Sequence, residues 1–220
     1  MSSATRIIAV RHGETEWNVD TRIQGQLDIG LNDKGRWQAQ RVAQALAEDA
    51  IDAVYSSDLS RAHATAQAIA AAQLGTEAAA PLAVQTHIGL RERGFGKFEG
   101  HTYAAIEQQW PEESRLWRIR DPHFAPTGGE SPVQVMARVG QAVAEIAARH
   151  LGQHIVLVAH GGVMDMLYRL ATQQSVSAPR TWELGNTAIN RLLWTPEGLT
   201  LVGWSDTRHL DGAQRDELGA

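Results

Sequence analysis

A histidine that follows an arginine, directly after an apolar run, is the part of this chain best suited to chemistry. Residues 7–10 are Ile-Ile-Ala-Val, and Arg11, His12 and Gly13 come next. Such a run before glycine predicts a buried strand that ends in a loop, and ligands of open α/β sheets bind at that edge. An imidazole nitrogen can act as a nucleophile, and arginine matches phosphate oxygens. The pair suggests phosphoryl transfer through a phosphohistidine, although such a pair alone is also compatible with a structural role.

A second histidine repeats this layout. His160, Gly161 and Gly162 follow the continuous apolar run at residues 155–159, which is typical of a central parallel strand covered on both faces. A helix is expected to begin near residue 163, and the free backbone N–H groups at its start could bind phosphate oxygens. The alternative for His160 is a hydrogen-bonded histidine of the core.

One arginine is expected in the first turn of a helix. Residues 53–56 predict a second strand, and Asp58 or Ser60 could cap the alanine-rich helix that follows it to about residue 72. Arg61 then lies where the helix dipole disfavours a cation, so its placement suggests a bound anion. The alternative is an exposed, solubilising arginine.

One glutamate lies in a glycine-rich segment. Glu92 precedes residues 94–100, which contain three glycines in seven positions, as is typical of backbone that bends closely around a ligand or of a mobile loop. A carboxyl group beside bound phosphate favours its protonated form, so Glu92 is a candidate general acid. A surface ion pair with Arg91 or Arg93 is the alternative.

Five short motifs occur in an order that resembles the histidine phosphatase superfamily, which includes the cofactor-dependent phosphoglycerate mutases. They are Arg11-His12-Gly13-Glu14-Thr15 with Asn18, Ser57-x-x-x-Arg61-Ala62, Leu90-x-Glu92, Gly128-Gly129-Glu130-Ser131 and Val158-x-His160-Gly161-Gly162. The resemblance implies an α/β fold, namely a three-layer αβα sandwich with a mixed, mostly parallel sheet. We expect one such domain over residues 1–220, since no internal repeat or linker contradicts it.

The resemblance also implies roles for individual residues. His12 is the expected nucleophile and Glu92 the expected proton donor, while Arg11, Arg61 and His160 hold the phosphoryl group. Further contacts to phosphate or substrate are expected from Asn18, Gln24, Gly25, Gly161 and Arg93. Turn formation is the alternative role for Asn18. Because arginine and histidine would neutralise the phosphate, we expect no metal ion and no cofactor.

The same machinery serves phosphatases and mutases. Mutases of the family carry a longer insertion after the acid, with a paired Arg-Arg segment and a proline run. Here residues 117–122 read Trp-Arg-Ile-Arg-Asp-Pro and pass quickly to Gly128. We therefore expect a phosphomonoester hydrolase, with a phosphoglycerate mutase (isomerase) as the alternative. A catalytically idle binding protein on the same scaffold is a third hypothesis, against which the intact His12 and Glu92 argue.

Composition limits the partners. A net charge of −5 argues against a general nucleic-acid binder, and the absence of cysteine excludes disulfides and thiolate catalysis. No apolar run reaches the roughly 18 residues of a membrane span, and residues 1–6 lack a following signal-peptide core. We expect a cytoplasmic enzyme with a small phosphorylated substrate and without membrane contact, and a homodimer remains open.

Other patterns predict the remaining elements. Asn32 is expected to cap a helix to about residue 48, and Ser131, Pro132 and Gln134 to begin a long helix with a capping box, ending near residue 150. Further expectations are a connection at residues 76–81, a strand at 82–86, two short lid helices within 101–125, a hairpin with a four-residue turn at 195–198, and a frayed tail after residue 210. Charges from residue 91 to 123 cancel, so no basic funnel is expected.

Overall fold

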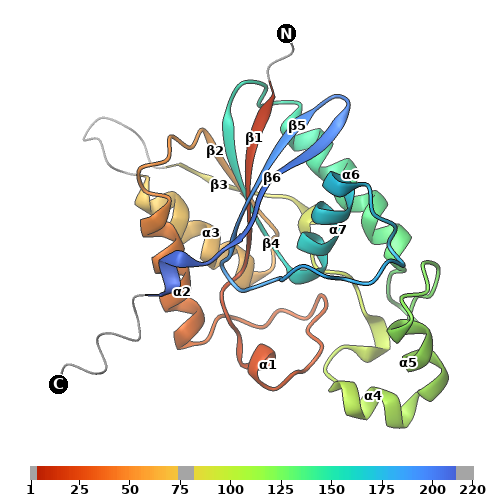
Figure 1. Cartoon of the computed structure of the whole chain (residues 1–220). Coiled ribbons are helices and arrows are strands. Elements are labelled where there is room, and N and C mark those ends of the chain that lie inside the picture. Colours follow the sequence, from red (N-terminus) through yellow and green to blue (C-terminus); the bar gives the residue numbers. More distant parts are fainter. Residues whose placement is uncertain (1–3, 74–81, 212–220) are drawn as a thin grey trace.

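A six-stranded sheet forms the centre of the molecule (Figure 1). The computed structural model describes residues 4–73 and 82–211. The strand order is β3-β2-β4-β1-β5-β6, where β1 (Thr5–Arg11), β2 (Ala53–Ser56), β3 (Val84–Thr86) and β4 (His154–Ala159) are parallel. Strand β5 (Ile189–Thr195) is antiparallel to both β1 and the edge strand β6 (Gly198–Asp206). The predicted mixed, mostly parallel sheet is confirmed.

Helices cover both faces of this sheet because its central strands are apolar on both sides. Ile8 and Val10 of β1 pack in a cluster with α2 (Asp33–Ala45) and α3 (Ser60–Ala72). Ile7 and Ala9 point the other way, into a cluster with α6 (Pro132–Ala147) and α7 (Gly161–Thr172). Alternate residues of one strand thus build two cores, which makes the three-layer αβα sandwich that was predicted.

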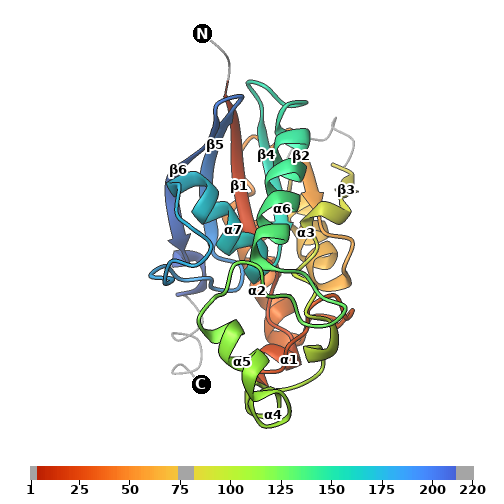
Figure 2. The same ribbon diagram turned by 90° about the vertical axis from the view of Figure 1, so that its right-hand side faces the viewer.

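Short helices lie beyond the carboxyl ends of the parallel strands. They are α1 (Glu16–Val19), α4 (Tyr103–Gln109) and α5 (Pro111–Arg118), which Figures 1 and 2 show below the sheet. The 3₁₀ turns η1 (Ile88–Leu90) and η2 (Gly96–Phe98) lead into them, and η3 (Arg208–Leu210) follows β6. A separate aromatic cluster around buried Phe98, including Trp110 and Trp117, anchors α4 and α5.

Two helix caps agree with the sequence and one does not. Asn32 accepts from the N–H of Gly35, and Ser131 forms the expected capping box with Gln134. For α3, however, neither Asp58 nor Ser60 caps the helix: Leu59 occupies the cap position without a side-chain hydrogen bond. The reason is tertiary, because Asp58 pairs with Arg91 and the hydroxyl of Ser60 donates to Asp28 at 2.7 Å.

Several boundaries differ by a few residues. The helices expected to reach residues 48 and 150 end at Ala45 and Ala147, α7 begins at Gly161, and the third strand is limited to Val84–Thr86. The β5–β6 hairpin turns on two residues, Pro196 and Glu197, because pairing extends to Thr195 and Gly198. The expected connection at 76–81 and the tail beyond residue 211 lie outside the described residues. In the described part of the chain, no helix has the length and apolar character to cross a membrane.

Two helical glycines should respond in opposite ways to alanine. A Cβ at Gly35 of α2 would lie 2.0 Å from the carbonyl oxygen of Glu14, in the loop after His12. At Gly140 of α6 the nearest atom would be Leu170 Cδ1 at 3.6 Å, an ordinary contact. We expect Gly35→Ala to lower the free energy of unfolding by about 1–3 kcal/mol through overpacking. Gly140→Ala should raise it by up to about 1 kcal/mol, since alanine favours helix. Urea unfolding measures both, and equal stabilisation would contradict the close approach of α2 to the His12 loop.

Candidate active site

One cavity at the carboxyl edge of the sheet collects residues from distant parts of the chain. It has a volume of about 620 Å³. Nine of the ten predicted site residues line it: Arg11, His12, Asn18, Gln24, Gly25, Arg61, Glu92, Arg93 and Gly161. The tenth, His160, lies directly behind, with its ring centroid 5.2 Å from that of His12. The sequence motifs therefore converge on one place.

His12 has a defined tautomer. Its side chain is almost fully buried, at 3% exposed, and its Nδ1 lies 2.6 Å from the carbonyl oxygen of Gly13. A carbonyl can only accept, so Nδ1 carries the proton and Nε2 keeps its lone pair. Nε2 is therefore the ring atom that is available as a nucleophile.

The backbone around His12 is fixed by three other segments. The N–H of His12 donates to the carbonyl of Ala159 on β4 at 3.0 Å. Its carbonyl accepts from Nδ2 of Asn186 at 2.8 Å, and the N–H of Gly13 donates to Thr65 Oγ1 at 3.1 Å. Asn186 and Thr65 were not identified from the sequence, because neither lies in a motif.

His160 occupies the cap position of α7. Its backbone is extended there, and its carbonyl accepts the first helical hydrogen bond, from Met164. The side chain is fully buried, and neither ring nitrogen has a hydrogen-bond partner within residues 4–73 and 82–211. A buried polar group normally has a partner, so a ring nitrogen beside the cavity is suited to a ligand oxygen.

Both histidines are kept neutral. Burial lowers the pKa of His12 well below 6.5, and the positive charges of Arg11 and Arg61 lower it further. For His160, burial is again the largest cause of a pKa well below 6.5, followed by the charge of Arg61. An imidazole must be unprotonated to attack phosphorus, so this environment keeps His12 in its reactive form at pH 7.

Two arginines offer unused donors beside His12. Arg61 is 1% exposed; its two terminal nitrogens donate to the carbonyls of Leu27 and Gly25, each at 2.8 Å. Arg11 donates through Nη1 to the carbonyl of Leu184. In the described chain the Nε atoms of both side chains are buried and have no partner. Phosphoryl oxygens are acceptors that could satisfy them, although Arg61 also holds the 25–27 loop, a role that the sequence did not predict.

Glu92 lies against the start of α7. The N–H of Gly162 donates to both carboxylate oxygens, at 3.1 and 3.0 Å, and the N–H of Arg93 donates to Oε1 at 2.7 Å. A Cβ at Gly162 would lie 2.2 Å from Glu92 Oε1, so only glycine permits this approach. One of the N–H groups expected to be free at this helix start, that of Gly162, is therefore already bonded to Glu92.

Two of the predicted contact residues, Asn18 and Gly25, also have structural roles. Oδ1 of Asn18 accepts from the N–H and the hydroxyl of Thr15, which completes a capping box at the start of α1, and Asn18 also lines the cavity. Gln24 is buried, and its Oε1 has no partner in the described chain. Gly25 has φ +52°, and a Cβ there would lie 2.1 Å from Oε1 of Glu99. Glu99 accepts from the N–H groups of Gln26 and Phe95 and thus fastens this loop.

The cavity is richer in cations than the sequence indicated. Seven arginines and four carboxylates line it, whereas the local count around residues 91–123 predicted no basic funnel. That expectation is wrong because Arg11, Arg61 and Arg180 come from other segments. Arg93 donates to the carbonyls of Glu130 and Phe124, and burial lowers its pKa to about 10, so it stays charged at pH 7. Arg180 and Asp165 were not identified from the sequence.

A neutral, buried histidine between arginines at the carboxyl edge of an αβα sandwich defines an enzyme that handles phosphoryl groups. The chain belongs to the histidine phosphatase superfamily (branch 1), whose family model matches residues 7–207. It is 41% identical to the phosphoglycerate mutase-like protein 4 of Arabidopsis thaliana over 93% of this chain and 86% of that protein. It is 36% identical to the metal-independent phosphoserine phosphatase of the same plant, over 95% and 84% of the two chains.

A solved structure supports the same class. The mycobacterial glucosyl-3-phosphoglycerate phosphatase in complex with VO3 superimposes with a TM-score of 0.79 at 34% identity, covering 92% of this chain and 99% of that one. The predicted class, a histidine phosphatase, is confirmed by these relatives, and they support the phosphatase over the mutase alternative.

The neutral histidines should make stability depend on pH. Because the pKa of His160 is lower in the folded state than the 6.5 of the free side chain, the unfolded chain binds the proton more readily. Its contribution is present above pH 6.5 and is lost as pH falls towards the folded-state pKa. We expect the free energy of unfolding to fall less steeply between pH 6.5 and 5.5 in His160→Asn, with slopes that differ by up to about 1.4 kcal/mol per pH unit. Urea unfolding at several pH values measures this, and equal slopes would contradict a neutral His160.

Proposed function

We propose that this chain hydrolyses small phosphomonoesters through a phosphohistidine on His12. The observation that carries the proposal is the state of that imidazole: it is buried, its pKa is lowered, and its Nδ1 proton is held by Gly13. The unused Nε donors of Arg11 and Arg61 lie at the same cavity, and Glu92 lines it too. A nucleophile, oxyanion donors and an acid are the three components that phosphoryl transfer to histidine needs.

In the first step Nε2 of His12 attacks phosphorus. The P–N bond forms as the ester P–O bond breaks, and protonated Glu92 gives its proton to the departing alcohol oxygen. A phosphomonoester dianion placed against this carboxyl group favours the protonated form that the step requires. Phosphorylation at Nε2 makes the ring cationic, and the carbonyl of Gly13, 2.6 Å from Nδ1, stabilises that charge.

In the second step water replaces the alcohol. The Glu92 carboxylate takes a proton from a water molecule, whose oxygen attacks phosphorus while the P–N bond breaks. Inorganic phosphate leaves, His12 regains its lone pair, and Glu92 is again protonated. The same residue thus acts as acid and then as base.

The transferred group would be held by fixed donors. Arg11, Arg61 and His160, with Asn18, can bind its oxygens and stabilise the charge that develops, which accounts for catalysis without a metal ion. The name of the metal-independent phosphoserine phosphatase supports this. The names of the relatives, phosphoserine and glucosyl-3-phosphoglycerate phosphatase, support a small phosphorylated metabolite as substrate and hydrolysis over mutase chemistry.

Substitution of the nucleophile tests the covalent step. With a ³²P-labelled phosphomonoester and rapid quenching, the native protein should acquire an acid-labile, alkali-stable label. His12→Ala should lose both label and turnover, because no other cavity residue supplies the same nitrogen. His154→Ala is the control, since His154 begins β4 at the opposite edge of the sheet. A label that persists in His12→Ala would show that His12 is not the residue that carries the phosphoryl group.

Substitution of the acid tests the leaving-group step. General acid catalysis is worth about 10²- to 10⁴-fold, and a good leaving group needs little of it. Glu92→Gln should therefore slow the hydrolysis of an alkyl phosphate far more than that of p-nitrophenyl phosphate. The measurement is kcat/KM for both esters.

Glu99→Gln provides the matched control for Glu92→Gln. It makes the same chemical change seven residues away and keeps the Oε1 acceptor for Gln26 and Phe95. The ratio of kcat/KM for the alkyl phosphate to kcat/KM for p-nitrophenyl phosphate should be the same in Glu99→Gln as in the native protein. If Glu92→Gln lowers both rates equally, or if Glu99→Gln changes the ratio instead, Glu92 is not the acid.

A further inference from the structure

The charge of the active-site cavity exceeds what one phosphoryl group requires. Seven arginines and four carboxylates line it, and both histidines at His12 and His160 are neutral. A phosphomonoester carries about two negative charges at neutral pH. One positive charge of the wall is then left without a counter-charge, or two when Glu92 is protonated as the proposed mechanism requires, so the cavity can accept a further anionic group.

One arginine is set apart from the other six by its lack of a protein partner. Hydrogen bonds or ion pairs engage Arg11, Arg22, Arg61, Arg93, Arg118 and Arg120. Within residues 4–73 and 82–211, Arg180 has none, and its side chain is exposed to solvent. Each carboxylate of the wall, by contrast, has a protein partner. Glu92 accepts from Gly162, Asp121 from His123 and Asp165 from Arg120, and Glu107 forms an ion pair with Arg118 at 2.8 Å.

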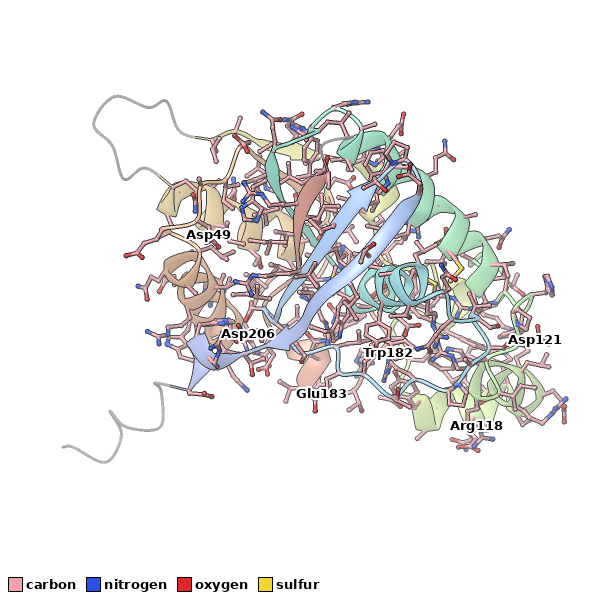
Figure 3. The ribbon with its side chains drawn as sticks, turned by 45° about the horizontal axis from the view of Figure 1, so that its top comes forward. Asp49, Arg118, Asp121, Trp182, Glu183 and Asp206 are labelled. Carbon is pink, nitrogen blue, oxygen red and sulfur yellow. The ribbon has the colours of Figure 1, made fainter. Side chains whose placement is uncertain are left out.

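The backbone that carries Arg180 is held by a buried arginine. Arg180 lies in the connector between α7 and β5, residues 173–188. Arg169 of α7 is fully buried and donates to the carbonyls of Ser175 and, at 2.9 Å, Ala178. Its guanidinium also lies 4.8 Å from the ring centroid of Trp182, whose ring stacks on that of Tyr168 in α7. Figure 3 shows Trp182 beside this helix. These contacts fix the connector on both sides of Arg180.

Asp165 joins this connector to the helices over the cavity. Its Oδ2 accepts from Arg169 Nε at 3.2 Å and from Arg120 Nη2 at 2.7 Å. Arg120, just after α5, donates in turn to the carbonyl of Val176 at 3.2 Å. Desolvating a charged group is costly, so a fully buried arginine is retained only where such partners compensate it. Arg180 is therefore presented from a rigid scaffold.

Arg180 also lies within electrostatic reach of the reacting end. It shares the cavity wall with Arg11 and Tyr103. Burial is the largest cause that lowers the pKa of Arg11, and the charge of Arg180 lowers it further. Because Arg180 comes from a separate connector, it can contact a part of the substrate other than the phosphoryl group.

We propose that Arg180 is a specificity-determining residue that binds a carboxylate on the alcohol portion of the substrate. The preferred substrates are then phosphomonoesters of small carboxylic acids, because a guanidinium fork matches a planar carboxylate through two parallel hydrogen bonds. This inference rests on the proposed function and narrows its substrate class.

The test compares two esters that differ only in the carboxylate. In glycerol 3-phosphate a hydroxymethyl group replaces the carboxylate of 3-phosphoglycerate. Loss of a hydrogen bond to a charged group is worth about ten- to hundredfold. Arg180→Gln should therefore raise KM for 3-phosphoglycerate about ten- to hundredfold and leave kcat/KM for glycerol 3-phosphate within about twofold. Arg180→Lys should recover part of the loss, since it keeps the charge but not the fork.

Arg149→Gln is the control for loss of surface charge. Arg149 is exposed and follows α6, near the amino end of β4 and away from the cavity. The Arg149→Gln substitution should leave unchanged the ratio of kcat/KM for 3-phosphoglycerate to kcat/KM for glycerol 3-phosphate. Equal losses on both esters in Arg180→Gln, or no loss on either, would overturn the proposal, because the side chain would then act on the phosphoryl group or not at all.

Binding separates this inference from the proposed function. In His12→Ala, calorimetry measures the Kd of 3-phosphoglycerate without turnover, and adding Arg180→Gln should raise that Kd by the same factor as KM. If the native protein hydrolyses p-nitrophenyl phosphate and the Kd does not change, only the role of Arg180 fails. If the native protein hydrolyses no ester while the Kd shifts as expected, the proposed function fails and the carboxylate site stands.

Discussion

Parallel pairing of β1 with β4 is the constraint on which the site depends. The register sets Arg11 opposite Ala159, and the N–H of His12 extends the ladder by one more bond to the Ala159 carbonyl. Two histidines that are 148 positions apart in the sequence thereby emerge side by side from neighbouring strands, with ring centroids 5.2 Å apart. A shift of one residue in this register would turn one of them to the opposite face of the sheet. The apolar residues on both faces of β1 and β4 prevent such a shift, since it would exchange their two cores.

Burial then determines the electrostatic state of the site. Desolvation opposes charge on His12 and His160, while the arginines around them keep their charge because their intrinsic pKa is high. The result is a neutral imidazole inside a cationic wall, which suits the nucleophile and the anionic substrate of the proposed mechanism. Arg61 shows how closely structure and function are linked here: its terminal nitrogens hold the carbonyls of Gly25 and Leu27, which leaves Nε for a ligand. Replacing it would alter the loop and the anion site together.

Sequence alone predicted what depends on local contacts or on motifs. The capping box at Ser131, the Asn32 cap and the strand at residues 53–56 were right because their determinants lie within a few residues. The cap at Asp58 was wrong because Arg91, 33 positions away, takes its carboxylate. Arg180 and Asn186 could not be found, since their positions follow from the path of the connector between α7 and β5, and Asp165 lies on α7 outside any motif. The length of the connector was the one available signal, because irregular segments longer than about 12–15 residues are uncommon and usually functional.

The place of Glu92 bears on the proton transfer of the proposed mechanism. Its carboxylate accepts from Gly162 at the start of α7, a position that the helix dipole also makes attractive to phosphate. Two anions in one cavity repel each other, and a proton shared between them relieves that repulsion. The backbone of Glu92 cannot retreat, because Gln26 and Arg138 both donate to its carbonyl. In the proposed mechanism, the proton that relieves the repulsion between Glu92 and the bound phosphoryl group is the one that Glu92 then passes to the leaving group.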